Sequence, residues 1–230
     1  MAKGSGMIHP SMATMLSYIT CDAGVDNILW SKMIKRVADS SFNAITVDGD
    51  TSTNDTFLAC SSGAELESKY LSILEEGLNL TAQYLAKAIA RDGEGANCLI
   101  EVNVEGALSD LDAHEIARTI ASSSLVKTAV HGSDPNWGRI IAALGRAGTS
   151  FNFNDVKLWI GPYEIFSNGI PLDFDRQIVS NFMKARLKGK YLIDDLINIR
   201  LKIGVGNHSA TAWGCDLSDQ YVRINADYTA

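Results

Sequence analysis

Two segments of the sequence alternate apolar and polar residues so regularly that each is expected to form a β-strand. In the clearer one, residues 197–203, four branched aliphatic residues are separated by Asn198, Arg200 and Lys202. The other covers residues 98–104 and is mostly strand-like. A strand with one apolar face needs other elements to pack against it, so the rest of the chain should supply helices or a second sheet.

Five further segments have apolar residues at the i, i+3, i+4 spacing of a helix, and the second of them is either one long helix or a broken pair. These segments are residues 30–38, 70–89, 109–125, 134–144 and 178–185. We expect the third helix to begin at the cap Ser109 and to bury Leu125. We expect the fourth to begin with Asp134 as N-cap and Pro135 in the first helical position.

The remaining patterns predict a strand over 156–160, a hairpin turn at Asn168-Gly169, and a last strand with an extended end over 219–230. Strands and helices therefore occur in mixed order, and some strands are joined by tight turns. This order predicts an α/β or α+β layered fold, with a mixed sheet and helices packed on its faces. It argues against a doubly wound nucleotide-binding fold.

Charge and cysteine content exclude several classes of protein. The 230 residues carry 20 Lys and Arg against 27 Asp and Glu, a net charge of −7, which argues against a nucleic-acid partner. The four cysteines form no Cys-x-x-Cys pair, so we expect reduced, mostly buried thiols in the cytoplasm and no metal site. No apolar run reaches the roughly 18 residues of a membrane span, and the start of the chain does not resemble a signal peptide.

Two polar motifs leave alternatives open. Lys3-Gly-Ser-Gly lacks the Gly-Lys-Ser/Thr of a P-loop, so it is either a flexible leader or a backbone that approaches a ligand, with Lys3 offered to a carboxylate. Residues 48–55 are rich in Asp, Ser, Thr and Asn, but Thr53 and Ala59 occupy the places where a calcium loop needs Gly and Glu. They form either a self-bonded turn or the lining of a polar pocket.

Basic side chains give weaker signals. The four histidines are scattered, and a Ser-His-Asp triad cannot be assembled from spacing alone. His114 falls in a helical pattern and is expected to be a surface or packing residue. Arg139 belongs to a capped helix start or, alternatively, holds a carboxylate.

Thr14 is a candidate nucleophile, because small residues and a Gly/Pro-rich approach precede it. Its hydroxyl could attack the Ala13 carbonyl and form an ester that water opens. The new terminal Thr would then hold a hydroxyl beside an amine with a pKa of about 8, which can act as general base at neutral pH. Ala-Thr is a common dipeptide, so the dipeptide alone does not decide the matter.

The sequence resembles the ornithine acetyltransferase family, which are bifunctional glutamate N-acetyltransferases of arginine biosynthesis. The resemblance rests on long stretches that occur in order along the whole chain. They read KGSGMIHPSMATML (3–16), TVDGDTSTNDT (46–56), GEGA (93–96) with LIEV (99–102), DPNWGR (134–139), and WGCDL (213–217) with YVRINADYT (221–229).

The resemblance implies a layered architecture of the N-terminal-nucleophile type, a self-processing precursor and a metal-free reaction. Residues 1–13 would correspond to the end of the upstream chain and 14–230 to the catalytic β chain. Cleavage between Ala13 and Thr14 would free Thr14 to carry acetyl from N-acetylornithine to glutamate by a ping-pong route. No cofactor is implied, although some members of the family accept acetyl-CoA as donor.

The resemblance also implies substrate contacts and partners. Lys3, Glu94 and Asn225 match substrate-binding residues, and charged or amide groups of these types suit an amino-acid substrate. The expected partner is the upstream α chain, in a heterotetramer of two α and two β chains, without nucleic acid or membrane.

Two departures from the family pattern bear on activity. The family has a large segment before the Lys-Gly-Ser-Gly stretch, whereas this sequence starts two residues before Lys3. That upstream segment would supply a Thr-Gly oxyanion hole, and the loss of a single such donor costs about a hundredfold or more in rate. Ala230 stands where the family commonly has a hydroxyl residue that contacts substrate. An inactive remnant or assembly subunit, or a related self-processing amidase or aminopeptidase, therefore remain as alternatives.

Overall fold

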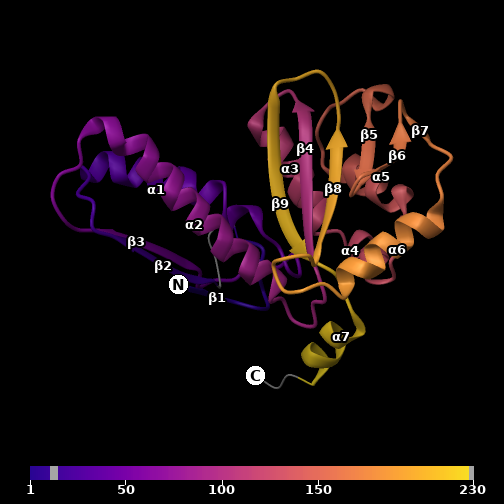
Figure 1. Ribbon diagram of the computed structural model, residues 1–230, viewed down its shortest axis with the longest axis horizontal. Helices are drawn as coiled ribbons and strands as arrows, with labels where there is room; N and C mark the ends of the chain where they lie inside the picture. The colour runs from indigo at the N-terminus through magenta and orange to yellow at the C-terminus, as the bar shows by residue number, and fades with distance from the viewer. Residues whose placement is uncertain (11–14, 228–230) are drawn as a thin grey trace.

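A computed structural model of the chain describes residues 1–10 and 15–227. Its strands form two sheets, one of three strands and one of six, and helices cover a face of each (Figure 1). Buried side chains form two hydrophobic clusters, one beneath each sheet. The α/β class with a mixed sheet, predicted from the order of the patterns, is confirmed.

The three-stranded sheet has the order β1 (Ala2–Lys3), β2 (Leu16–Cys21), β3 (Thr56–Ser61). β1 is antiparallel to β2, with Lys3 opposite Leu16, and β2 is parallel to β3. Helices α1 (Asn27–Asp39) and α2 (Leu71–Arg91) pack on one face of this sheet. The segment predicted over 70–89 is thus a single long helix rather than a broken pair, and it begins one residue later, at Leu71.

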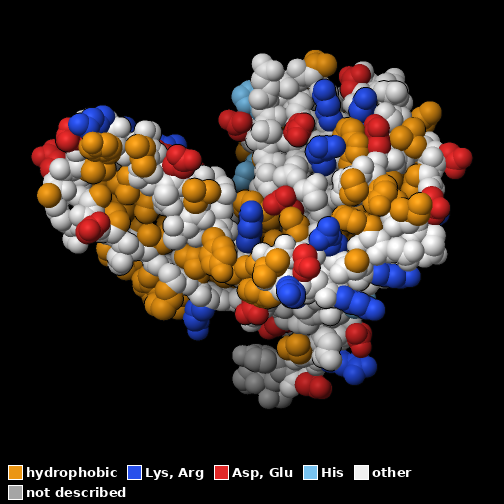
Figure 2. Space-filling view, in the orientation of Figure 1, with side chains coloured by type: hydrophobic (Ala, Val, Ile, Leu, Met, Phe, Trp, Pro, Cys, Tyr) orange, Lys and Arg blue, Asp and Glu red, His pale blue; other side chains and the backbone are white. Residues whose placement is uncertain are grey.

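The other face of the three-stranded sheet is exposed and partly apolar. Tyr18 and Leu58 are register partners on this face and remain 39% and 48% exposed. Figure 2 shows hydrophobic side chains gathered over this part of the molecule. Such a face is typical of a surface that another chain or segment covers.

The six-stranded sheet has the order β7-β6-β5-β8-β4-β9, with β4 parallel to β8 and antiparallel to β9. Its strands are β4 (Leu99–Ala107), β5 (Lys157–Ile160), β6 (Tyr163–Ser167), β7 (Ile170–Pro171), β8 (Leu196–Lys202) and β9 (His208–Cys215). The strands predicted over 98–104, 156–160 and 197–203 are present. Asn168 and Gly169 both have positive φ angles of 52° and 78°, as a tight hairpin turn between β6 and β7 requires.

The alternation in β4 and β8 separates an apolar face from a polar face. Helices α3 (Asp110–Ala121), α4 (Ser124–His131), α5 (Trp137–Arg146) and α6 (Arg176–Leu187) contribute to the apolar core with the inward side chains of the strands. On the opposite face, Glu101 accepts hydrogen bonds from Trp213 at 2.8 Å and from Asn198 at 3.0 Å. These helices cover one side of the sheet. The apolar residues at the even-numbered positions of 98–104 face that side, and the polar residues face the other.

Helix starts show where local patterns decide and where they mislead. The Ser109 side chain caps α3 by accepting from the Asp112 amide at 3.1 Å, as predicted. The prediction that the same helix buries Leu125 is wrong, because the chain turns at 122–123 and Leu125 lies on α4, where it is 58% exposed. Asn136, not Asp134, is the N-cap of α5, because its side chain accepts from the Arg139 amide. Asp134 instead pairs with Arg176 at 2.8 Å.

The strand predicted over 219–230 is wrong for the described residues, which form helix α7 (Asp219–Ala226). Arg223 pairs with Asp219 one turn earlier at 3.2 Å, an interaction that favours a helix. α7 extends away from the lower end of β9 (Figure 1). In residues 1–10 and 15–227, no helix is long and apolar enough to cross a membrane.

The expectation of mostly buried thiols holds for two of the four cysteines. Cys98 and Cys215 are buried, Cys21 is half-buried and Cys60 is exposed. Cys60 is exposed because it lies in β3 on the uncovered face of the three-stranded sheet, in register with Thr20.

Candidate functional site

The N-terminal segment is held against the body of the protein by the polar loop after Val47. The Asp48 carboxylate accepts from the Met7 amide at 2.6 Å and from the Ile8 amide at 3.1 Å. It also accepts from the Asp50 amide, so the loop bonds its own backbone as a turn does. The Thr51 hydroxyl donates to the His9 carbonyl at 2.8 Å. Residues 3–9 are thus a fixed part of the structure rather than a flexible leader.

Three of the predicted site residues border one cavity. Lys3, Glu94 and Asn225 line a hollow of about 860 Å³, together with residues of the N-terminal segment and of α2. Asn225 on α7 donates from Nδ2 to Glu94 Oε2 at 2.7 Å. These residues are up to 222 positions apart in the sequence, and the fold brings them together.

Glycines allow the N-terminal segment to approach Glu94 closely. A Cβ atom on Gly6 would lie 2.7–2.8 Å from the Glu94 carboxylate atoms, a distance that real Cβ contacts do not show. The Glu94 amide donates to the Ser5 carbonyl at 3.0 Å. Gly95 has a φ of 70°, which a residue with a side chain adopts with strain. The loop and the segment are therefore pressed together around the carboxylate.

Asp216 connects the Glu94 loop to the chain that leads into α7. Its fully buried carboxylate accepts from the Asn97 and Cys98 amides at 2.7 and 3.0 Å, and from Asn97 Nδ2 at 2.9 Å. Nδ1 of the half-exposed His131 ring lies 2.8 Å from Asp216 Oδ2, the oxygen that also accepts from Asn97 Nδ2. Two residues on, the Ser218 hydroxyl donates to the Gly95 carbonyl at 2.7 Å. Glu94 and Asn225 are thus positioned by one hydrogen-bonded unit.

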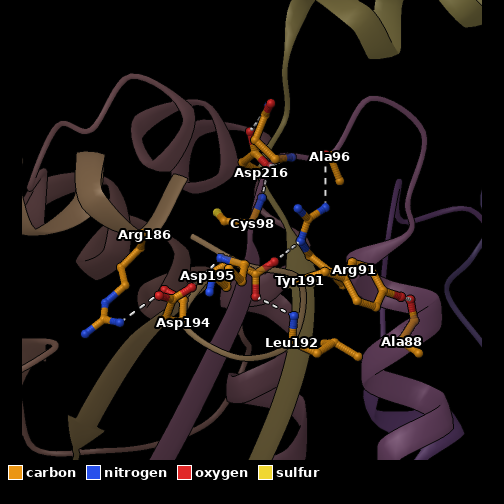
Figure 3. Close-up of polar contacts among 12 residues, drawn as sticks. Ala88, Arg91, Ala96, Cys98, Arg186, Tyr191, Leu192, Asp194, Asp195 and Asp216 are labelled. Atoms are coloured by element: carbon orange, nitrogen blue, oxygen red, sulfur yellow. Dashed lines mark hydrogen bonds and ion pairs between the residues drawn. The ribbon is translucent and has the colours of Figure 1, made fainter. Parts of the chain in front are cut away.

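Arg91, the last residue of α2, and Asp195 form an ion pair beside Tyr191 (Figure 3). Arg91 bonds the buried Asp195 carboxylate and donates to the Ala96 carbonyl at 3.1 Å. Asp195 also accepts from the Leu192 amide at 2.9 Å. Next to it, Tyr191 lines the cavity and donates to the Ala88 carbonyl at 3.2 Å. Burial raises the pKa of Tyr191, so its hydroxyl remains a neutral donor.

The charges around the cavity suit a ligand with both an ammonium and a carboxylate group. Lys3 offers a cation to a carboxylate, while Glu94 and Asp92 offer carboxylates to an amine. The carboxylate of Glu94 is half-buried and already accepts one bond from Asn225. The arrangement can orient an amino acid by its two charged ends.

Ala13 and Thr14, the predicted cleavage site and nucleophile, lie outside the described residues, as does Ala230. Of the described residues that flank them, Pro10 and Met15 are buried, and the Met15 carbonyl accepts from the Thr56 amide at 2.7 Å. Leu16, two positions after Thr14, is the register partner of Lys3. The cavity wall and the chain that continues from Thr14 are therefore neighbours in the same small sheet.

The sequence patterns place Asp48 in a polar turn without giving it a role in positioning the site, and they do not single out Asp195 or Asp216. Asp48, Asp195 and Asp216 each have a buried or half-buried carboxylate that accepts backbone amides. Asp48 and Asp216 fall inside the stretches 46–56 and 213–217 that carry the family resemblance, which is the one signal that could have pointed to them. Arg139 donates to the Leu125 carbonyl and the Thr128 hydroxyl, in agreement with a structural role.

Comparison with known proteins places the whole chain in one family. The family model for ArgJ matches residues 1–230. The chain is 87% identical to an "Arginine biosynthesis bifunctional protein ArgJ" of Prochlorococcus marinus (strain NATL2A) and 55% identical to that of a Synechococcus species, over 100% and 99% of its length. It spans only 54% and 56% of those relatives.

A solved structure supports the same assignment. The crystal structure of "Arginine biosynthesis bifunctional protein argJ" from Bacillus halodurans superposes with a TM-score of 0.85 at 39% sequence identity. The match covers 94% of this chain and 100% of the solved chain. The chain therefore belongs to the ArgJ family.

Proposed function

We propose that this chain is the downstream, catalytic part of an acetyltransferase of arginine biosynthesis. In this proposal, residues 1–13 end the upstream chain and residues 14–230 form the β chain. The enzyme transfers acetyl from N-acetylornithine to glutamate, and Thr14 carries the acetyl group between them. No metal or organic cofactor takes part, and acetyl-CoA is a possible alternative donor.

Self-cleavage creates the nucleophile. The Thr14 hydroxyl attacks the Ala13 carbonyl carbon, and the peptide bond becomes an ester as the Thr14 nitrogen leaves and takes up a proton. Water then hydrolyses the ester. The products are a carboxylate on Ala13 and a free α-amine on Thr14, which can serve as general base for its own hydroxyl.

Acetyl transfer follows in two steps. The Thr14 hydroxyl gives its proton to the α-amine and attacks the acetyl carbonyl of N-acetylornithine, and ornithine leaves with that proton. The α-amine of glutamate next attacks the acetyl-threonine ester. N-acetylglutamate leaves, and the hydroxyl is restored. The oxyanion of each step would be stabilised by the Thr-Gly pair of the upstream part.

The observation that carries this proposal is the convergence of Lys3, Glu94 and Asn225 on one cavity. One wall of this cavity is the N-terminal segment that leads toward Thr14. In that segment, Lys3 is the register partner of Leu16, two residues after Thr14. Lys3 would bind the substrate carboxylate, and Glu94 with Asn225 would bind an amine. Because both substrates are amino acids, the same charged ends serve donor and acceptor in turn.

The comparisons support a two-chain enzyme. The curated relatives are almost twice as long as this chain, yet the solved chain from Bacillus halodurans is covered completely by it. A half-length solved chain is what a cut precursor would give. The upstream chain is accordingly the proposed partner, in a heterotetramer of two α and two β chains, and the exposed face of β2 and β3 is its proposed contact.

The test is intact mass and acetyl transfer, measured on this chain co-expressed with the upstream half of a relative. A species that begins at Thr14 and transfers acetyl to glutamate supports the proposal. Thr14→Ala should abolish both cleavage and transfer, and Thr14→Ser should keep part of each. Glu94→Gln should weaken substrate use and leave cleavage intact. Full turnover in Thr14→Ala would overturn the role of Thr14, and acetyl release to water without transfer would favour an amidase.

A further inference from the structure

A second cavity lies on the outer side of α3 and is built from basic and hydroxyl side chains. It measures about 410 Å³ and is lined by His9, Glu115, Arg118, Thr119, Ser122 and Arg146. As far as the described residues line them, it shares no residue with the cavity of Lys3, Glu94 and Asn225. The proposed acetyl transfer uses none of these side chains.

Arg118 is the unusual member of this cavity. Its side chain is half-buried, and its Nε is inaccessible and has no hydrogen-bond acceptor among the described residues. Among residues 1–10 and 15–227 it forms no ion pair, whereas Arg91 pairs with Asp195. A partly buried guanidinium stays charged and is costly to leave without an anion. The protein thus keeps an unpaired cation at the wall of a cavity.

The neighbouring groups include one carboxylate, Glu115, and a second guanidinium group. Arg146 in the last turn of α5 also lines the cavity and is exposed. The Thr119 hydroxyl donates to the Glu115 carboxylate at 3.5 Å, and the Ser122 hydroxyl donates to the Thr119 carbonyl at 3.2 Å. Glu115 does not reach Arg118 closely enough to form an ion pair. Two guanidinium groups therefore face one carboxylate in a chain whose net charge is −7.

His9 gives the cavity a wall from the N-terminal segment. Its Nδ1 lies 3.0 Å from the Thr46 hydroxyl, so Nε2 is the ring nitrogen left for a ligand. Burial, and secondly the charge of Arg118, lower the pKa of His9, so the ring is neutral at pH 7. His9 is five residues before Thr14 in the sequence.

We propose that this second cavity is a binding site for a small oxyanion, a carboxylate or phosphate group of a metabolite. Arg118 and Arg146 would hold the anion, and the Thr119 and Ser122 hydroxyls would turn to it from their present acceptors. Guanidinium and hydroxyl donors are the groups that bind such anions in proteins. The site is independent of the chemistry at Thr14. A bound anion would touch the segment that runs toward the cleavage site.

The proposal is tested by calorimetric titration of the co-expressed two-part protein with inorganic phosphate and, separately, with succinate, at constant ionic strength. At least one of the two anions should bind saturably, and the preferred one names the class of ligand. Arg118→Gln should weaken that binding about tenfold or more, since a charged hydrogen bond is lost. Arg118→Lys should keep part of it, and Thr119→Val should give a smaller loss.

Arg176→Gln is the matched control, because it removes the same charge from an exposed residue on α6, and it should leave binding unchanged. The anion should also raise the melting temperature of the wild type and of Arg176→Gln, but not that of Arg118→Gln. Absence of saturable binding in the assembled protein would overturn the proposal. That result is expected if a carboxylate of the upstream half already occupies the site. Equal binding by Arg118→Gln and Arg176→Gln would overturn it as well.

Discussion

At the scale of single residues, the candidate site depends on how closely the N-terminal segment approaches the Glu94 carboxylate. Glu94 has a glycine at one side, Gly6, and the amide of Asn225 at the other. The position of the Glu94 carboxylate therefore depends on the missing side chain of Gly6 as well as on the hydrogen bond from Asn225. Because the atoms are already near contact distance, small additions should have large effects on substrate binding.

Gly6→Ala should raise KM for the amino-acid substrate by about tenfold, because the new Cβ would meet the Glu94 carboxylate at 2.7–2.8 Å and displace it. Steady-state kinetics on the assembled enzyme measures this effect. Gly77→Ala is the control, since a Cβ there, on the exposed side of α2, meets no heavy atom of the described residues within 4 Å. It should leave KM unchanged and stabilise the helix by up to about 1 kcal/mol. Equal KM values for the two variants would contradict this account of Gly6.

His9 should make folding stability depend on pH. Burial, followed by the charge of Arg118, lowers its pKa, against smaller opposing effects of Glu115, Asp48 and Asp50. The unfolded chain therefore binds the proton more readily, below about pH 6.5. Stability from this group is present above that pH and is lost as the pH falls toward the lower folded value.

The measurement for His9 is the melting temperature between about pH 5 and 7. His9→Gln should reduce the slope of melting temperature against pH in this range, whatever its effect at pH 8. An unchanged slope would show that other groups cause the acid sensitivity.

At the scale of elements, local sequence patterns correctly predicted the start of α3 and the β6–β7 turn, which depend on interactions between adjacent residues. Helix α3 begins at Ser109 and the hairpin turns at Asn168-Gly169 because capping and positive φ angles depend on adjacent residues. The strand predicted over 219–230 failed because α7 buries none of its residues, so no hydrophobic stripe marks it. The bond between Glu94 and Asn225 spans 131 positions. Only the family resemblance could link them before the fold was known.

Asp216→Asn should destabilise the protein by about 2–4 kcal/mol. One carboxylate oxygen accepts two amides and the other faces Asn97 Nδ2 and the His131 ring, so an Asn amide group would set donor against donor. Because the same bonds place Glu94 and Asn225, KM should also rise at temperatures where the variant is folded. Urea unfolding and steady-state kinetics measure the two effects.

Asp219→Asn provides the comparison for Asp216. Its carboxylate is mostly exposed and pairs with Arg223 one turn later in α7, an interaction worth less than about 1 kcal/mol. A similar loss of stability in both variants, or a normal KM for folded Asp216→Asn, would remove Asp216 from the positioning of the site.

At the scale of the whole molecule, the two sheets differ in how completely they are covered. The six-stranded sheet has four helices packed against its apolar face and a hydrogen-bonded polar face on the other side. In the part of the chain that the structure describes, the three-stranded sheet is covered by α1 and α2 on one face, and its other face exposes Tyr18 and Leu58. The chain also spans only 54% of a close relative. The uncovered apolar face is therefore the place where the remaining half is expected to pack.

Leu58→Glu should abolish co-purification with the upstream half, because a charge would be buried in an apolar contact without a partner. The variant should retain its own fold, since Leu58 is 48% exposed and outside the core. Leu125→Glu is the matched control on α4, with an exposure of 58%, and should co-purify normally. Pull-down of the tagged upstream half, with cleavage at Thr14 followed by intact mass, gives both readouts. Loss of association without loss of fold, confined to Leu58→Glu, assigns this face to the partner, whereas normal association of Leu58→Glu places the partner elsewhere.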